Sequence, residues 1–153
     1  MKTILVAVDM SAATSVVVDA ARQMTLGHGA TLYLVHVEQP DPDFVGYGVG
    51  PQYIRDHLAE DFQGDRRTIH ELRDSLEKEG VCVHGRVIQG PTIEKIVEEA
   101  KRLDADLIVV GQHNRGLLHR LLQGSVTDGV IHKAPCPVLV VPVDAPAGPA
   151  VDH

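Results

Sequence analysis

Five short apolar runs alternate with segments of helical periodicity, and this alternation most constrains the fold. Runs without polar interruption are typical of strands that are buried on both faces of a parallel sheet. Alternating strands and helices favour right-handed crossovers with helices on both faces. We therefore predict an α/β fold with an open five-stranded parallel sheet. The five runs are TILVAVD (3–9), TLYLVHVE (31–38), VCVHGRVIQ (81–89), DLIVVG (106–111) and CPVLVVPV (136–143).

Four segments between or beside these runs have apolar residues at the spacing of amphipathic helices. They are 11–29, about 52–78, 90–106 and 124–134. Gly27 is the candidate end of the first helix, and Gly64 is a candidate break in the second. The third apolar run is interrupted by His84, Gly85 and Arg86, so we predict that it forms an edge strand.

Two stretches have the composition of irregular chain. Residues 39–51 contain three prolines and three glycines, which predicts a long loop, and such loops are usually functional or mobile. Residues 144–153 have little to pack, and we expect a disordered tail there. The chain of 153 residues then forms one domain, residues 1–143, because it is too short for two substantial cores.

The net charge, the first apolar run and the cysteines limit the partners, the location and the redox chemistry that we expect for this chain. A formal net charge of −7 argues against general affinity for nucleic acid or for an anionic membrane. The first apolar run is too short for a signal peptide or a membrane span, so a cytoplasmic protein is expected. Cys82 and Cys136 fall in predicted strands without a CxxC motif, which indicates two reduced core thiols.

Two of the predicted strands end in residues suited to a ligand site. Ligands of open parallel sheets bind beyond the carboxyl ends of the strands, where the strand order reverses. With the order 3-2-1-4-5, Asp9 and Gly111 would meet at that reversal. A glycine lets a ligand approach the backbone, and Gly124 precedes a helix that begins near Ser125. The N–H groups of a helix N-terminus suit a phosphate, so these residues together describe an anion site.

Each of these residues also has a structural interpretation. Ser125 with Asp128 resembles a capping box, and Asp9 could belong to the N-cap region of the first helix. Gly111 and Gly124 could serve turns alone. Motifs of catalysis are missing from the sequence: there is no HExxH, no GxSxG and no GxxxxGK[ST]. We therefore expect at most a weak ATPase activity, with no catalytic or metal-binding residues assigned.

Four stretches of the chain resemble the universal stress protein (UspA-type) family. They are ILVAVDMS, LYLVHV, ADLIVVGQHNRG and LLQGSVTDGVIHKAPCPVLVVP, and the likeness covers nearly the whole chain. The resemblance implies a Rossmann-like sheet of the adenine nucleotide alpha hydrolase-like type, in the strand order 3-2-1-4-5. It also implies a homodimer, a role in the stress response and binding of an adenine nucleotide.

Members of this family that bind ATP carry the pattern Gly-x2-Gly-x9-Gly-[Ser/Thr]. This chain has Gly111-x2-Asn114-x9-Gly124-Ser125, so asparagine replaces the second glycine. Asparagine tolerates the left-handed backbone conformation better than most residues, which favours retained binding of ATP or AMP, with or without Mg²⁺. If the glycine instead serves close approach of a phosphate, the asparagine side chain either obstructs the phosphate or donates an amide hydrogen bond to it. By resemblance, Asp9 and the backbone of Val37 would hold the ribose and adenine. The nucleoside pocket would be lined by Ala7, Val8 and Val110. The phosphates would be surrounded by Gly111, His113, Asn114, Gly124, Ser125, Val126 and Thr127.

Two functional hypotheses follow. The first is a dimeric stress-response or regulatory protein that binds ATP or AMP with weak or no hydrolysis. The second is a dimeric adaptor that has lost nucleotide binding and engages a protein partner. In both, the homodimer would form through the last strand, residues 136–142, because that run is apolar and would lie at a sheet edge.

Overall fold

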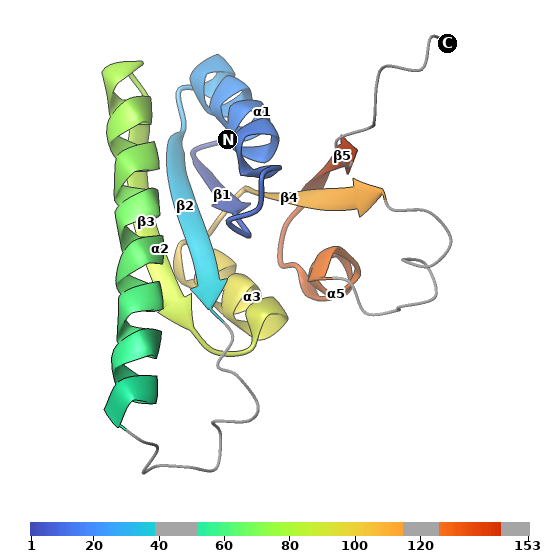
Figure 1. The fold of residues 1–153 in the computed structure, drawn as a ribbon. Coiled ribbons are helices and arrows are strands. Elements are labelled where there is room, and N and C mark those ends of the chain that lie inside the picture. The colour runs from blue at the N-terminus through green and yellow to red at the C-terminus, as the bar shows by residue number, and fades with distance from the viewer. Residues whose placement is uncertain (39–51, 115–125, 145–153) are drawn as a thin grey trace, which may run out of the picture.

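The computed structural model describes residues 1–38, 52–114 and 126–144 (Figure 1). The predicted loop at 39–51, the motif residues Gly124 and Ser125, and residues 145–153 lie outside the described part of the chain. The side chains of residues 52–62, 113, 114 and 144 also lie outside it. The predictions made for these residues therefore remain predictions.

Five parallel strands form one sheet in the order β3-β2-β1-β4-β5, as predicted. The strands are β1 (Thr3–Ala7), β2 (Thr31–Glu38), β3 (Cys82–Gln89), β4 (Leu107–Asn114) and β5 (Val138–Asp144). The strand order reverses between β1 and β4, where Val6 lies beside Val109. The prediction of an edge position for β3 is also confirmed.

Helices cover both faces of the sheet. They are α1 (Thr14–His28), α2 (Gln52–Lys78), α3 (Thr92–Arg102) and α5 (Val126–Lys133). The predicted end of α1 at Gly27 is wrong: the cap is Gly29, whose φ of 61° places it in the left-handed region. Its N–H donates to the Thr25 carbonyl and closes the helix. Helix α2 continues through Gly64 without a break, and Thr68 donates its hydroxyl hydrogen to the Gly64 carbonyl.

Successive strand residues project to opposite faces, and this alternation divides the core into two clusters. The α1/α2 face carries Val6, Leu34 and Val109 from the strands together with side chains of α1 and α2. The α3/α5 face carries Leu5, Val35, Ile108 and others together with side chains of α3 and α5. Because both faces are covered, the strands read as continuous apolar runs in the sequence.

The cysteines are free, as predicted, but the core placement is wrong for Cys82, and Cys136 is only partly buried against the core cluster of the α3/α5 face. Cys82 is exposed because it begins the edge strand β3, and Cys136 is half-buried in the turn before β5. Burial raises the pKa of the Cys136 thiol. Among the residues that the structure describes, no helix is long and apolar enough to cross a lipid bilayer.

Candidate functional site

The carboxyl ends of β1, β2 and β4 bring several of the predicted site residues to one edge of the sheet. Val8, Val37 and Val110 are buried there, with Ala7 half-buried beside them. The Val8 N–H donates to the Val35 carbonyl at 2.9 Å, so β1 and β2 remain paired one residue beyond the ladder. Ala7, Val8, Val37 and Val110 therefore form an apolar surface at the reversal of strand order, which we call the floor.

Asp9 organises the turn between β1 and α1. Its Oδ1 accepts hydrogen bonds from the Ser11 N–H at 3.0 Å, the Ser11 hydroxyl at 2.6 Å and the Thr14 hydroxyl at 3.4 Å. The N-cap of α1 is Ala13, with no side-chain cap hydrogen bond, so Asp9 lies in the turn before the helix and does not cap it. Met10, between them, has a φ of 61°, a left-handed conformation that non-glycine residues seldom adopt.

Gly111 is required by helix packing. A Cβ at this position would lie 2.7 Å from Cγ2 of Val17, which belongs to α1, and 3.5 Å from Cγ2 of Val143. Contact with α1 therefore accounts for the missing side chain on the α1/α2 face, and ligand approach is not needed to explain it. The Gly111 carbonyl accepts a hydrogen bond at 2.8 Å from the hydroxyl of Thr127, a buried residue of α5.

That hydrogen bond fixes the start of α5 beside the end of β4. Val126, the first residue of α5, is exposed, whereas Thr127 is buried against the strand. The structure therefore places two parts of the predicted site on neighbouring strands: the β1–α1 turn follows β1, and the start of α5 is hydrogen-bonded to β4. His113 and Asn114 are placed by their backbone at the end of β4.

His36 lies on the α1/α2 face near the same edge, and both of its ring nitrogens have close partners. Nδ1 is 2.8 Å from the Val8 carbonyl oxygen, and Nε2 is 3.2 Å from Oδ2 of Asp65 in α2. With 8% of its surface exposed, His36 is a buried histidine with polar partners on two elements. The contact with Asp65 has no sequence signal, because it depends on how α2 packs on the sheet.

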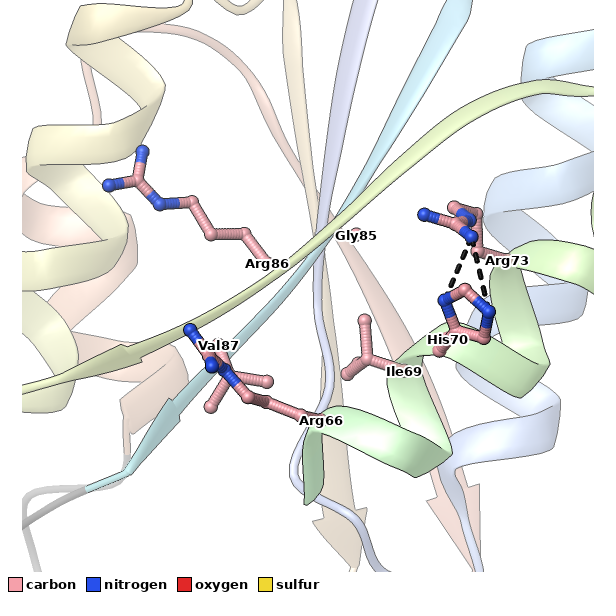
Figure 2. Close-up of a pocket in the computed structure, with 7 residues that line it drawn as sticks. All are labelled: Arg66, Ile69, His70, Arg73, Gly85, Arg86 and Val87. Carbon is pink, nitrogen blue, oxygen red and sulfur yellow. Dashed lines mark hydrogen bonds between the residues drawn. The ribbon is translucent and has the colours of Figure 1, made fainter. Parts of the chain in front are cut away.

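A hollow lies between α2 and the edge strand β3, away from these strand ends. Its volume is about 340 Å³, and Figure 2 shows Arg66 and Arg73 on its α2 side. Arg73 forms ion pairs with Asp74 and Glu77, and Arg86 points to the opposite side of β3, where it lies 3.0 Å from Glu99. Since Arg73 and Arg86 are matched by carboxylates of the chain itself, the hollow is less suited to an anion than its arginines suggest. The remaining lining residues are Ile69, His70, Gly85 and Val87.

Comparison with known proteins identifies the family. The model of the universal stress protein family matches residues 1–142. The Thermus aquaticus universal stress protein in the QAH/OAS sulfhydrylase 3′ region is 31% identical over 146 residues, covering 92% of this chain and 98% of the relative.

Two solved structures have the same fold. A universal stress protein in complex with cAMP is 24% identical, with a TM-score of 0.69 and coverage of 92% of this chain and 95% of that one. The Archaeoglobus fulgidus universal stress protein in complex with dAMP is 24% identical, with a TM-score of 0.66 and coverage of 92% and 98%. The sequence match and the shared fold agree, and this chain belongs to the universal stress protein family.

Proposed function

We propose that this protein binds ATP or AMP, with or without Mg²⁺, at the carboxyl edge of β1, β2 and β4. The observation that carries the proposal is that the Asp9 turn follows β1 and the start of α5 is hydrogen-bonded to β4, so that the two flank the reversal of strand order. The left-handed Met10 supports it, because unusual backbone conformations cluster at functional sites. The cAMP and dAMP complexes of the two similar proteins supply the ligand class.

In this proposal the ribose and adenine lie on the floor formed by the strand ends. Asp9 accepts hydrogen bonds from the ribose hydroxyls, and the backbone of Val37 reads the adenine edge. Ala7, Val8 and Val110 contact the nucleoside. The phosphates reach the end of β4 and the start of α5, where helix N–H groups and the Thr127 region suit an anion. The phosphate-binding group comprises Gly111, His113, Asn114, Gly124, Ser125, Val126 and Thr127.

A titration of ATP and AMP, each with and without Mg²⁺, tests the site in the nucleotide-free protein. We expect Asp9→Asn to weaken nucleotide binding by about tenfold or more, since a hydrogen bond to a charged group contributes ~1.5–3 kcal/mol. Asp106→Asn is the matched control. Asp106 also accepts hydrogen bonds from backbone N–H groups, those of Lys2 and Thr3, but at the opposite end of the sheet. Absence of binding by the wild type, or equal weakening in both variants, would contradict the proposal.

The variant Asn114→Gly distinguishes the hypothesis that this chain has kept nucleotide binding from the hypothesis that it has lost it. Equal affinity in wild type and variant means that asparagine is a tolerated replacement for the second motif glycine. Binding in the glycine variant alone would favour the adaptor hypothesis. Calorimetry with ATP gives both affinities directly.

Hydrolysis, if present, is expected to be slow, since the sequence has no recognised catalytic motif. A phosphate-release assay on wild type, Asp9→Ala and Ser125→Ala checks this point. Release that persists in both variants would show a contaminating ATPase. Release that both variants abolish would assign a weak activity to the nucleotide site.

The edge strand β5 supports a homodimer. Val138, Leu139, Val140 and Val141 are only half-buried in the single chain, and β4 is their neighbour in the sheet. An apolar sheet edge favours pairing with a second copy. Sedimentation equilibrium at micromolar concentration should show a dimer, and Val140→Lys should shift it towards monomer. A wild-type monomer at that concentration would contradict this part of the proposal. A dimer without nucleotide affinity would leave the adaptor hypothesis.

A further inference from the structure

The ring of His36 is held in an orientation that directs Nε2 towards the carboxylate of Asp65. Nδ1 lies 2.8 Å from the Val8 carbonyl, and a carbonyl only accepts hydrogen bonds, so Nδ1 carries a hydrogen. In the neutral ring Nε2 then has a lone pair. That lone pair faces Oδ2 of Asp65 at 3.2 Å, and a carboxylate is also an acceptor. A cation between the two atoms, either a proton or a metal ion, is needed to make this contact favourable.

A second carboxylate completes the group. Glu38 lies two residues after His36 on β2, so both side chains project to the same face of the sheet. Asp65 reaches the same place from α2, which covers that face. The candidate ligand atoms of His36, Glu38 and Asp65 all lie within 4.8 Å of one another.

We propose that His36, Glu38 and Asp65 bind a divalent first-row transition metal such as Zn²⁺. Adjacent ligands of a metal with bonds of ~2.1 Å are about 3–3.4 Å apart, and the Nε2–Oδ2 separation of 3.2 Å fits this range. Histidines that bind metals usually donate their second ring N–H to a carbonyl or carboxylate, as Nδ1 does to Val8 here. The nitrogen ligand favours Zn²⁺, Co²⁺ or Mn²⁺ over Mg²⁺, which prefers oxygen ligands.

The metal site is distinct from the nucleotide site proposed above. His36 and Glu38 project to the α1/α2 face, whereas Val37 between them packs in the cluster on the α3/α5 face. The two sites share the end of β2 and the Val8 backbone, but the metal needs no phosphate. Binding of the metal can therefore be measured on nucleotide-free protein, and its failure would leave the nucleotide proposal standing.

Titration of chelator-treated, nucleotide-free protein tests the proposal. Zn²⁺ is titrated against a competing chelator, and Co²⁺ is followed by its visible absorption. We expect one ion per chain, with affinity weakened at least about tenfold by Asp65→Asn and by Glu38→Gln. Mg²⁺ should not compete. Circular dichroism confirms that the variants fold.

The matched control is Asp74→Asn on the same helix. His70 and Asp74 form a second histidine–aspartate contact, 3.3 Å apart, but both side chains are exposed at 59% and 44%. This variant should bind Zn²⁺ as wild type does. The proposal would be overturned by absence of binding, or by affinity that Asp65→Asn and Glu38→Gln leave unchanged.

Nitrogen NMR of the His36 ring distinguishes the metal from the proton. A shift of the Nε2 resonance on addition of Zn²⁺, with Nδ1 remaining protonated, supports the metal site. A ring that stays doubly protonated at saturating Zn²⁺ would show that a proton alone joins His36 to Asp65, and would overturn it.

Discussion

The α1/α2 face of the sheet buries a polar strand residue, His36, whereas the buried polar groups described on the α3/α5 face come from helices. His36 projects from the middle of β2 and is held by Val8 from a neighbouring strand and by Asp65 from α2. On the other face, Thr127 of α5 donates to the β4 carbonyl of Gly111. Glu99 of α3 is paired with Arg86 and Arg102.

This difference shows what each polar group can do. A polar side chain that projects from a strand is fixed in direction, because the sheet sets the direction of its Cα–Cβ bond and the covering helix closes over it. Such a group suits a site in which the direction of one nitrogen matters. A polar group on a helix next to the sheet mainly joins the helix to the sheet. Removing that side chain should therefore lower the free energy of unfolding by the contribution of a single hydrogen bond or ion pair.

Truncation of a buried apolar side chain should lower the free energy of unfolding by a similar amount on either face of the sheet. Leu34 on the α1/α2 face and Ile108 on the α3/α5 face are both fully buried. Leu34→Ala and Ile108→Ala should each lower the free energy of unfolding by about 2–5 kcal/mol, measured by urea denaturation. Leu26→Ala is the control, since Leu26 is 46% exposed and its loss should change stability by less than ~0.5 kcal/mol. A loss confined to one face would contradict the division into two comparable cores.

The close contact between α1 and β4 can be broken at Gly111. Gly111→Ala places a methyl group against Val17 and should lower the free energy of unfolding by about 1–3 kcal/mol. In a strand without this contact the same substitution would be stabilising by ~0.5–1 kcal/mol. The double variant Val17→Ala, Gly111→Ala tests the cause by urea denaturation. A coupling energy near zero between the two positions would show that they do not compete for the same space.

Gly111 also shows how far the sequence could predict the site. The family resemblance implied the strand order, and the polar interruption of the third apolar run predicted the edge position of β3; both are confirmed. Gly111 was predicted to end the fourth strand, but β4 continues to Asn114, and the missing side chain of Gly111 leaves room for Val17 of α1. Sequence patterns locate small residues, and only packing shows which neighbour needs the space.

The wrong burial prediction for Cys82 and the unpredicted contact of Asp65 have related causes. Cys82 lies in an apolar run and was therefore predicted to be buried, yet the first residue of an edge strand has an open side. Asp65 lies on a charged helix, where one carboxylate cannot be told from the others by periodicity. Its contact with His36 arises from the position of α2 over β2, which no local pattern encodes.

The attachment of α5 to the sheet can be loosened at Thr127. Thr127→Val keeps the shape of the side chain but removes the hydroxyl that donates to the Gly111 carbonyl. The free energy of unfolding should fall by about 0.5–1.5 kcal/mol in urea denaturation. Thr127→Ser keeps the donor and should lose less. A larger loss in the serine variant would show that the methyl group, and not the hydrogen bond, holds α5 in place.

The smallest effect concerns Asp106, which joins two strands without belonging to the core of either face. The Lys2 N–H donates to its Oδ2 at 2.7 Å and the Thr3 N–H at 2.9 Å, and these hydrogen bonds hold the pKa of Asp106 below its usual range. The folded state therefore favours the ionised carboxylate. Its contribution to stability is complete well above the unfolded pKa of ~3.9 and is lost as the pH falls through the lower folded pKa.

Asp106→Asn should consequently be less stable than the wild type at pH 7, and the difference should shrink as the pH falls below about 4. Urea midpoints measured at several pH values give this difference directly. Thr127→Val is the control, because it removes a group that does not titrate, so its deficit should stay constant over the same range. A deficit of Asp106→Asn that is equally constant would mean that the carboxylate charge contributes nothing to the β1–β4 connection, and that the backbone ladder and the packing of the two faces hold the strands together.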